Sequence, residues 1–292
     1  MRQYPRWLHK GFSPDGTARH VRELLSDLGL NTVCESALCP NLRECYSQRQ
    51  LTFMILGNRC TRSCRFCAVD SGRPVPVAED EPFRVAEAAR RLGLRHVVIT
   101  SVARDDLRDE GAGHFVKVVR AVRDRNPGLS VEVLVPDFHA RKDCVDLILE
   151  QVHPEVFAHN VETIERLSNL LRPQADYRRS LEVLELAARH PGSQIIKSSL
   201  MVGLGETEAE IMQTFQDLVR VGATHLTIGQ YLRPDADHLP VMEYISPERF
   251  RHYEQLAAQC GLMWIQAGPF VRSSYHAVDA VHFASQNEKV IF

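Results

Sequence analysis

The sequence predicts an α/β fold, a partial (β/α)6 barrel, and three observations support this prediction. From residue 51 onward, short apolar segments alternate with segments of helical periodicity. Six strand-like segments occur in this alternation, fewer than the eight of a closed barrel. Polar motifs follow the carboxyl ends of these segments, where parallel α/β folds have their active sites. We therefore expect parallel strands, joined by right-handed crossovers, around a mouth that a leader or a tail covers.

Residues 1–50 are expected to form an extension before the barrel, without a clear strand. Residues 21–28 show a short helical pattern, and the segment Pro5-Arg6-Trp7-Leu8 is expected to be held in place by its tryptophan. Three cysteines follow this pattern, in a loop or on short helices: Cys34, Cys39 and Cys45. The barrel is expected over residues 51–268, and a tail over residues 269–292.

The expected strands are short apolar runs bounded by glycine, proline or polar residues. They span residues 52–56, 96–100, 130–135, 155–159, 194–201 and 225–228. The expected helices have apolar residues at helical spacing, and Gly93 ends the first of them. They span residues 82–92, 115–125, 141–150, 163–171, 177–188, 206–221 and 247–260. A short strand at residues 263–266 follows the last helix.

Length and composition exclude several classes of protein. The chain has 292 residues, of which 44% are hydrophobic, so it can bury a substantial core. Its net charge of -2 gives no reason to expect a nucleic-acid partner. No run approaches the roughly 20 apolar residues that span a membrane, and the first ten residues lack the apolar core of a secretory signal. We therefore expect a soluble, cytoplasmic protein without a membrane partner.

Six of the eight cysteines lie within 34 residues, in two groups of three. The first triad has the spacing C-x4-C-x5-C, and the second, Cys60, Cys64 and Cys67, has the spacing C-x3-C-x2-C. Three thiolates leave one iron of a four-iron cluster open to an outside ligand, whereas a structural zinc site takes four protein ligands. The second triad therefore favours an iron–sulfur cluster over zinc. For the first triad, its spacing alone leaves a zinc site or unrelated core cysteines open.

The second triad, directly after the first strand, resembles the motif of the radical S-adenosylmethionine (radical SAM) superfamily. The resemblance implies that Cys60, Cys64 and Cys67 hold a [4Fe–4S] cluster whose open iron binds the amine and carboxylate of S-adenosylmethionine. It also places Phe66 near the adenine, a position equally compatible with an aromatic that covers the cluster from water. Reductive cleavage of the cofactor then gives a radical that takes hydrogen from an unactivated C–H bond.

Further motifs resemble one family of this superfamily, the lipoyl synthases, nearly from end to end. They are Pro5-Arg6-Trp7-Leu8, Glu35-Ser36-Ala37-Leu38-Cys39-Pro40-Asn41, Thr100-Ser101-Val102-Ala103-Arg104-Asp105-Asp106-Leu107, His159-Asn160-Val161-Glu162-Thr163, Leu200-Met201-Val202-Gly203-Leu204-Gly205-Glu206-Thr207, Gly229-Gln230-Tyr231-Leu232-Arg233-Pro234 and Arg272-Ser273-Ser274-Tyr275. The resemblance implies a second, auxiliary [4Fe–4S] cluster on Cys34, Cys39 and Cys45, with Ser274 as its fourth ligand. Ser273 is the competing candidate for this fourth ligand. This auxiliary cluster is the implied sulfur source and is consumed in the reaction.

Polar residues at the strand ends are the candidates for contacts with the cofactor: Thr100, Asn160, Glu162, Lys197, Ser199 and Gln230. Asn160 and Glu162 also fit plain structural roles, as a turn residue and a helix-start acid. Lys197 must find an anion or reach water, and the cofactor carboxylate or the substrate is the expected partner. Ser199 stands where the family commonly has glycine. The charged run Arg104-Asp105-Asp106 fits either a solvated loop or a site near the clusters.

The resemblance implies the insertion of two sulfur atoms into an octanoyl chain bound to a lysine of a lipoyl carrier domain. The implied carriers are acyltransferase subunits of 2-oxoacid dehydrogenases and the carrier protein of the glycine cleavage system, and ferredoxin or flavodoxin is the implied reductant. Three alternatives stay open: another radical SAM enzyme with an auxiliary cluster, a zinc-stabilised binding protein, and a non-redox barrel enzyme. Cys144 and Cys260 occupy apolar positions of helical patterns and are interpreted as core residues.

Overall fold

A single sheet organises the computed structural model, which describes residues 4–11, 16–192 and 194–287. In this part of the chain the sheet has eight strands, ordered in space as in the sequence. They are β1 (Asn31–Thr32), β2 (Thr52–Ile55), β3 (His96–Ser101), β4 (Ser130–Leu134), β5 (Val156–Ala158), β6 (Ile195–Val202), β7 (His225–Gln230) and β8 (Trp264–Gly268). β1 pairs with β2 in antiparallel orientation, and the pairs from β2 to β8 are parallel. The predicted partial barrel of parallel strands is confirmed.

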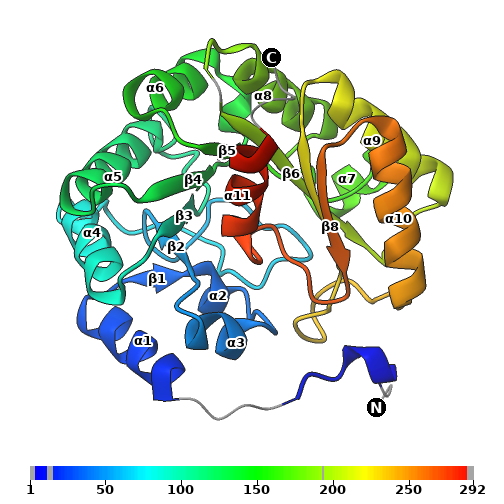
Figure 1. The fold of residues 1–292 in the computed structure, drawn as a ribbon, viewed down its shortest axis with the longest axis horizontal. Helices are drawn as coiled ribbons and strands as arrows, with labels where there is room; N and C mark the ends of the chain where they lie inside the picture. The colour runs from blue at the N-terminus through cyan, green and yellow to red at the C-terminus, as the bar shows by residue number, and fades with distance from the viewer. Residues whose placement is uncertain (1–3, 12–15, 193, 288–292) are drawn as a thin grey trace.

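The helices between the strands form an outer ring around the sheet (Figure 1). They are α4 (Glu81–Leu92), α5 (Ala112–Arg125), α6 (Lys142–Val152), α7 (Glu165–Leu171), α8 (Tyr177–Arg189), α9 (Glu208–Arg220) and α10 (Pro247–Cys260). A short 3-10 helix, η2 (Phe138–Ala140), precedes α6. α4 ends at Gly93, which takes the left-handed conformation with φ 62° that glycine adopts without strain. Apolar side chains of the strands and of the inner helix faces make one continuous core.

The extension before the barrel contains η1 (Arg6–Leu8), α1 (Gly16–Asp27), α2 (Val33–Ser36) and α3 (Leu42–Ser47). The expectation that it has no strand was wrong, because Asn31 and Thr32 form β1 along the edge of β2. A strand of two residues has no alternation that a sequence pattern can reveal. Thr32 also accepts a hydrogen bond from the Glu35 backbone N–H at the start of α2, and its hydroxyl contacts the buried Tyr46 hydroxyl at 2.7 Å.

The tail contains a helix that the sequence pattern did not predict, α11 (Ala277–Asn287). α11 lies in the centre of the ring of strands in Figure 1 and contacts β3. The ring of Phe283 lies 6.1 Å from that of His225, the first residue of β7. α11 therefore covers the amino-terminal end of the barrel, opposite to the end where the active sites of such folds lie.

Residues 269–276 connect β8 to α11 and cross the extension on the way. Asn41 donates a hydrogen bond of 2.6 Å from Nδ2 to the backbone carbonyl oxygen of Phe270. The Tyr275 hydroxyl donates one of 2.9 Å to Glu44 Oε1. The tail and the extension therefore meet in one seam between the two edges of the sheet.

Candidate active site

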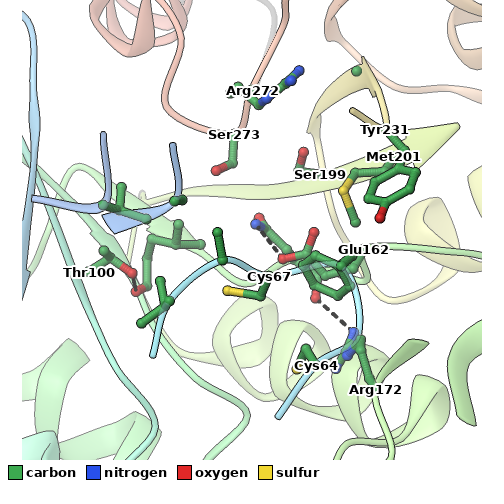
Figure 2. Close-up of a pocket in the computed structure, with 18 of the residues that line it drawn as sticks. Cys64, Cys67, Thr100, Glu162, Arg172, Ser199, Met201, Tyr231, Arg272 and Ser273 are labelled. Atoms are coloured by element: carbon green, nitrogen blue, oxygen red, sulfur yellow. Dashed lines mark hydrogen bonds between the residues drawn. The ribbon is translucent and has the colours of Figure 1, made fainter. Parts of the chain in front are cut away.

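A cavity of about 510 Å³ lies at the carboxyl ends of the strands (Figure 2). It is called the main cavity below. Nine of the residues singled out in the sequence line it: Cys60, Cys64, Phe66, Cys67, Thr100, Asn160, Glu162, Ser199 and Gln230. The tail contributes Val271, Arg272 and Ser273 to the same wall. The structure thus brings together at one mouth residues that are more than 200 positions apart in the chain.

The loop of the second triad is fixed by buried ion pairs. Arg62 lies 2.6 Å from Asp105 and 2.7 Å from Asp137, which holds the loop against the ends of β3 and β4. Cys60 Sγ accepts hydrogen bonds from the backbone N–H groups of Arg62 at 3.4 Å and Ala103 at 3.3 Å. Asp105 therefore braces the loop of the second triad, while Asp105 and Asp106 themselves stay exposed, so the acidic part of the charged run is solvated and also lies near this triad.

Of the six triad cysteines, Cys34 is buried and the other five are partly buried. Burial raises the pKa of Cys64 to about 11 and that of Cys67 to about 12. Burial likewise raises the pKa of Cys34 to about 11 and that of Cys45 to about 12. These four thiols are protonated at neutral pH, so metal binding must release their protons.

The spacing of the thiols fits a cluster better than a single ion. Sulfur atoms around one zinc ion lie about 3.8 Å apart, as tetrahedral Zn–S bonds of about 2.3 Å require. Within the described residues, the three ligand atoms that all lie within 4.8 Å of one another belong to Asp105, Glu110 and His139, and neither cysteine triad meets this limit. Neither triad therefore has its three sulfur atoms at the spacing that a single zinc ion requires.

A carboxylate and an amide meet after β5. Asn160 Nδ2 donates a hydrogen bond of 3.0 Å to Glu162 Oε1, while the buried Asn160 Oδ1 has no partner in the described part of the chain. Glu162 has the left-handed φ of 65°, an unusual conformation for a residue with a side chain, and residues in such conformations cluster at functional sites. Burial raises the pKa of Glu162, although the positive charge of Arg172 lowers it. The unsatisfied amide oxygen fits a ligand that brings its own donor, such as a ribose hydroxyl.

Arg172 and His159 complete this wall and were not predicted as site residues. Arg172 follows α7 and donates from its guanidinium to the Val161 carbonyl at 2.7 Å and to Ser180 Oγ at 2.7 Å. Burial lowers the pKa of His159 to about 4, so its imidazole is neutral, and Nδ1 lies 2.8 Å from the Val135 carbonyl. The His159-Asn160 motif marked the histidine in the sequence, whereas no local pattern marked the arginine.

Three further candidates line the main cavity with their polar groups already engaged. The Thr100 hydroxyl donates to the Leu134 carbonyl at 2.8 Å, and Ser199 Oγ accepts from Thr227 Oγ1 at 2.8 Å. Gln230 Nε2 donates to the Glu243 carbonyl at 3.0 Å, and its Oε1 accepts from the backbone N–H of Ile245 at 2.8 Å. This amide holds the following loop in place while Gln230 lines the main cavity, and its expected contact with adenine or ribose stays a prediction.

Lys197 is not among the residues that line the main cavity, where its expected contact with the cofactor or the substrate would occur. Its Nζ lies 3.0 Å from both carboxylate oxygens of Glu132, inside the barrel. Burial raises the pKa of Glu132, and the nearby ammonium lowers it. The sequence required an anion for this lysine, and the anion is a side chain on β4.

The first triad lines a second, smaller cavity of about 30 Å³. Its lining consists of residues from the extension, from the start of β2 and from the tail: Cys34, Cys39, Asn41, Cys45, Gln50, Leu51, Thr52, Arg272, Ser274 and Tyr275. Cys34 lies on α2 and Cys45 on α3, the short helices considered in the sequence. Ser274 lies among the three cysteines and accepts a hydrogen bond of 2.7 Å from Thr52 Oγ1, whereas Ser273 faces the main cavity.

The fold and the site define a class of protein. The profile of the Radical SAM superfamily matches residues 54–218. Methylornithine synthase has a similar structure, with a TM-score of 0.53 at 13% identity over 93% of each chain. SuiB of Streptococcus suis, bound to precursor peptide SuiA, gives a TM-score of 0.57 at 10% identity over 92% of this chain, which spans 58% of SuiB. At these identities the solved structures support the fold alone, and the profile shows a radical SAM enzyme.

Curated relatives narrow the class to one family. Lipoyl synthase of Caldanaerobacter subterraneus is 50% identical over 94% of this chain and 95% of its own length. Lipoyl synthase of Rubrobacter xylanophilus is 50% identical over 94% of this chain and 85% of its own. The chain belongs to the lipoyl synthase family.

Membership in this family decides between the alternatives that the sequence left open. The chain is a lipoyl synthase, with two [4Fe–4S] clusters and S-adenosylmethionine as its cofactors, and it acts on octanoylated carrier domains. A zinc-stabilised binding protein and a non-redox barrel enzyme are excluded. Within the described residues, none of the helices has the length and apolar character needed to cross a membrane.

Proposed function

We propose that the two cysteine triads of this lipoyl synthase hold two clusters with different roles, one at each cavity. Cys60, Cys64 and Cys67 hold the cluster that binds S-adenosylmethionine in the main cavity. Cys34, Cys39, Cys45 and Ser274 hold the cluster that donates sulfur. The placement of each triad in a cavity of its own, with the Arg272-Ser273-Ser274 segment at both, is the observation that supports this assignment.

In the main cavity, S-adenosylmethionine and its cluster, when bound, supply the hydrogen abstraction that no acid or base side chain can perform. The side chains of the protein hold the cysteine loop and orient the cofactor. The hydrogen bonds to Cys60 Sγ and the Arg62 ion pairs fix the cysteine loop. Asn160 Oδ1, which lacks a partner among the described residues, and the Glu162 carboxylate accept hydrogen bonds from the cofactor's hydroxyl or amine groups. Phe66 lines the same cavity, where it would lie near the adenine.

In the small cavity, the proposed ligands are three soft thiolates of the first triad and one hard oxygen of Ser274. An alkoxide is a poorer and more easily protonated ligand than a thiolate, so an iron held by Ser274 would be the most weakly bound iron of the cluster. A cluster that gives up its sulfur needs one iron that is bound more weakly than the others. The hydrogen bond from Thr52 Oγ1 holds the Ser274 oxygen in the cavity with the cysteines.

The substrate is an octanoyl chain on a lysine of a carrier domain, and two of its carbons each receive one sulfur. The main cavity offers apolar walls for such a chain, including Met54, Leu134 and Met201. The carriers are acyltransferase subunits of 2-oxoacid dehydrogenases and the glycine cleavage carrier protein. Ferredoxin or flavodoxin supplies the electrons, since the chain has no flavin motif of its own.

The experiment is a count of iron and acid-labile sulfide on anaerobically prepared protein. We expect about eight irons per chain in the wild type and about four in the Cys60/Cys64/Cys67→Ala variant. Cys260→Ala, which removes a cysteine of α10, is the matched control and keeps about eight. About four irons in the wild type and none in the triple variant would contradict the assignment of a cluster to the first triad. Formation of lipoyl product from an octanoyl peptide then tests the reaction itself.

A further inference from the structure

Arg272 lines both cavities. Its neighbour Ser273 faces the main cavity, and Ser274 faces the small cavity. Figure 2 shows Arg272 and Ser273 on the same stretch of chain, next to the main cavity. Residues 272–274 are therefore the partition between the two sites, and any sulfur that moves from one cavity to the other passes this segment.

The guanidinium of Arg272 has no carboxylate to balance it among the described residues. Its Nη1 donates to the Val271 carbonyl at 2.7 Å, and no aspartate or glutamate of the described chain forms an ion pair with it. Arg62, in contrast, is buried between Asp105 and Asp137. Arg272 is partly buried, and a partly buried cation without a balancing charge is costly unless a bound anion supplies one.

The backbone around Arg272 fixes the position of this cation. A Cβ on Gly229, at the end of β7, would overlap with the Val271 carbonyl oxygen and would lie 3.3 Å from Arg272 Nη1. The tail thus passes directly over β7, where only glycine leaves room. Arg272 is therefore held at the partition by packing and does not depend on a flexible surface loop.

The anion that fits is the sulfur donor of the small cavity. Three thiolates and one alkoxide carry four negative charges, which exceed the two positive charges of an oxidised [4Fe–4S] core, and reduction adds one more negative charge. Net charge and hydrogen bonds to the sulfurs set the reduction potential of such a cluster. A guanidinium at the wall of the cavity provides both a balancing charge and N–H donors.

We propose that Arg272 is a positioning residue for sulfur transfer, which balances the negative charge of the first-triad cluster and holds that cluster at the wall of the main cavity. This inference rests on the proposed assignment of the first triad and adds a fifth residue to its site. Arg272 is not a ligand, so its loss leaves the iron bound but changes the electrostatics of the cluster.

The test isolates the auxiliary cluster in a Cys60/Cys64/Cys67→Ala background and measures its reduction potential. We expect Arg272→Met to shift the potential in the negative direction, because the reduced, more negative cluster loses a stabilising cation. A tenfold change in the reduction equilibrium appears as a shift of about 59 mV for one electron. Arg272→Lys keeps the charge and should recover most of the shift. Arg233→Gln removes a cation that lines only the main cavity and should leave this potential unchanged.

With both triads intact, sulfur insertion should fall at least tenfold in Arg272→Met, while cleavage of S-adenosylmethionine continues. Equal potentials in Arg272→Met, Arg272→Lys and the parent, each with about four irons, would overturn the inference. A parent background that binds no iron would instead overturn the proposed assignment of the first triad, so the two failures are distinguishable. A variant that loses iron altogether would show that Arg272 is needed to build the cluster, which contradicts a role in charge balance alone.

Discussion

Adjacent serines of the tail face different cavities, and this difference leads to a prediction at the scale of single residues. Ser274 lies with the first triad, while Ser273 lines the main cavity. We expect Ser274→Ala to reduce lipoyl formation by about 100-fold or more, since it removes a cluster ligand, whereas loss of a supporting residue costs about 10–100-fold in metal sites. Ser273→Ala should stay within a few-fold of the wild type. Product formation and iron content per chain check both variants, and equal activity in the two would contradict the assignment of Ser274.

The sequence marked the cysteines of the site, and the motif Arg272-Ser273-Ser274-Tyr275 included one of its arginines, but it did not mark Arg172. Clustered thiols have few roles, so their spacing is informative. Arginine is common on surfaces, and nothing next to Arg172 in the sequence indicates that tertiary contacts bury it. Alternation along β6 placed Lys197 and Ser199 on one face of the strand, but it did not give their depth in the barrel. Of these two residues, only Ser199 lies close enough to the carboxyl end of β6 to line the main cavity.

At the scale of helices and strands, a buried ion pair between Lys197 on β6 and Glu132 on β4 links these two strands across β5. We expect Lys197→Met to lower the free energy of unfolding by about 3–5 kcal/mol, because it leaves a buried carboxylate without its partner. Replacing both residues, in Lys197→Met/Glu132→Leu, should restore most of this loss. Urea unfolding of the anaerobic enzyme measures both values. A single variant with unchanged stability but weakened binding of S-adenosylmethionine would contradict the structural role of Lys197.

Elements with a strong local pattern were predicted, and the ones missed depend on the rest of the molecule. β2 to β7 are apolar runs between turn residues, and α4 ends at a glycine that takes a positive φ. β1 has two residues, which are too few to show the alternation of apolar and polar residues that marks a strand. α11 is stabilised by covering the amino-terminal end of a finished barrel, as the contact of Phe283 with His225 shows. That surface does not exist until the parallel strands β2 to β8 are in place.

At the scale of the whole molecule, the small cavity is assembled from the two ends of the chain. Cys34, Cys39 and Cys45 come from the extension, and Ser274 comes from the tail about 230 residues later. We infer that the predicted segments 1–50, 51–268 and 269–292 act as one unit, since Asn41 and Thr52 donate hydrogen bonds to the tail and Glu44 accepts one from it. The main cavity takes most of its lining from the barrel, whereas the small cavity is lined mainly by residues of the extension and the tail.

Whether the small cavity depends on the seam between extension and tail can be tested by loosening the seam without touching a ligand. Tyr275→Phe removes the hydrogen bond of 2.9 Å to Glu44, which contributes about 1 kcal/mol at this partly exposed position. We expect a chelator to remove iron from the first triad several times faster, while the second triad keeps its iron, since only the first triad lies at the seam. Tyr177→Phe is the matched control, because it removes a hydrogen bond of 3.1 Å to Asp217 on the outer helices. It should lower global stability by a similar amount and leave the release of iron unchanged. Equal rates of iron loss from the first triad in the two variants would mean that overall stability, and not the seam, controls the sulfur-donor site.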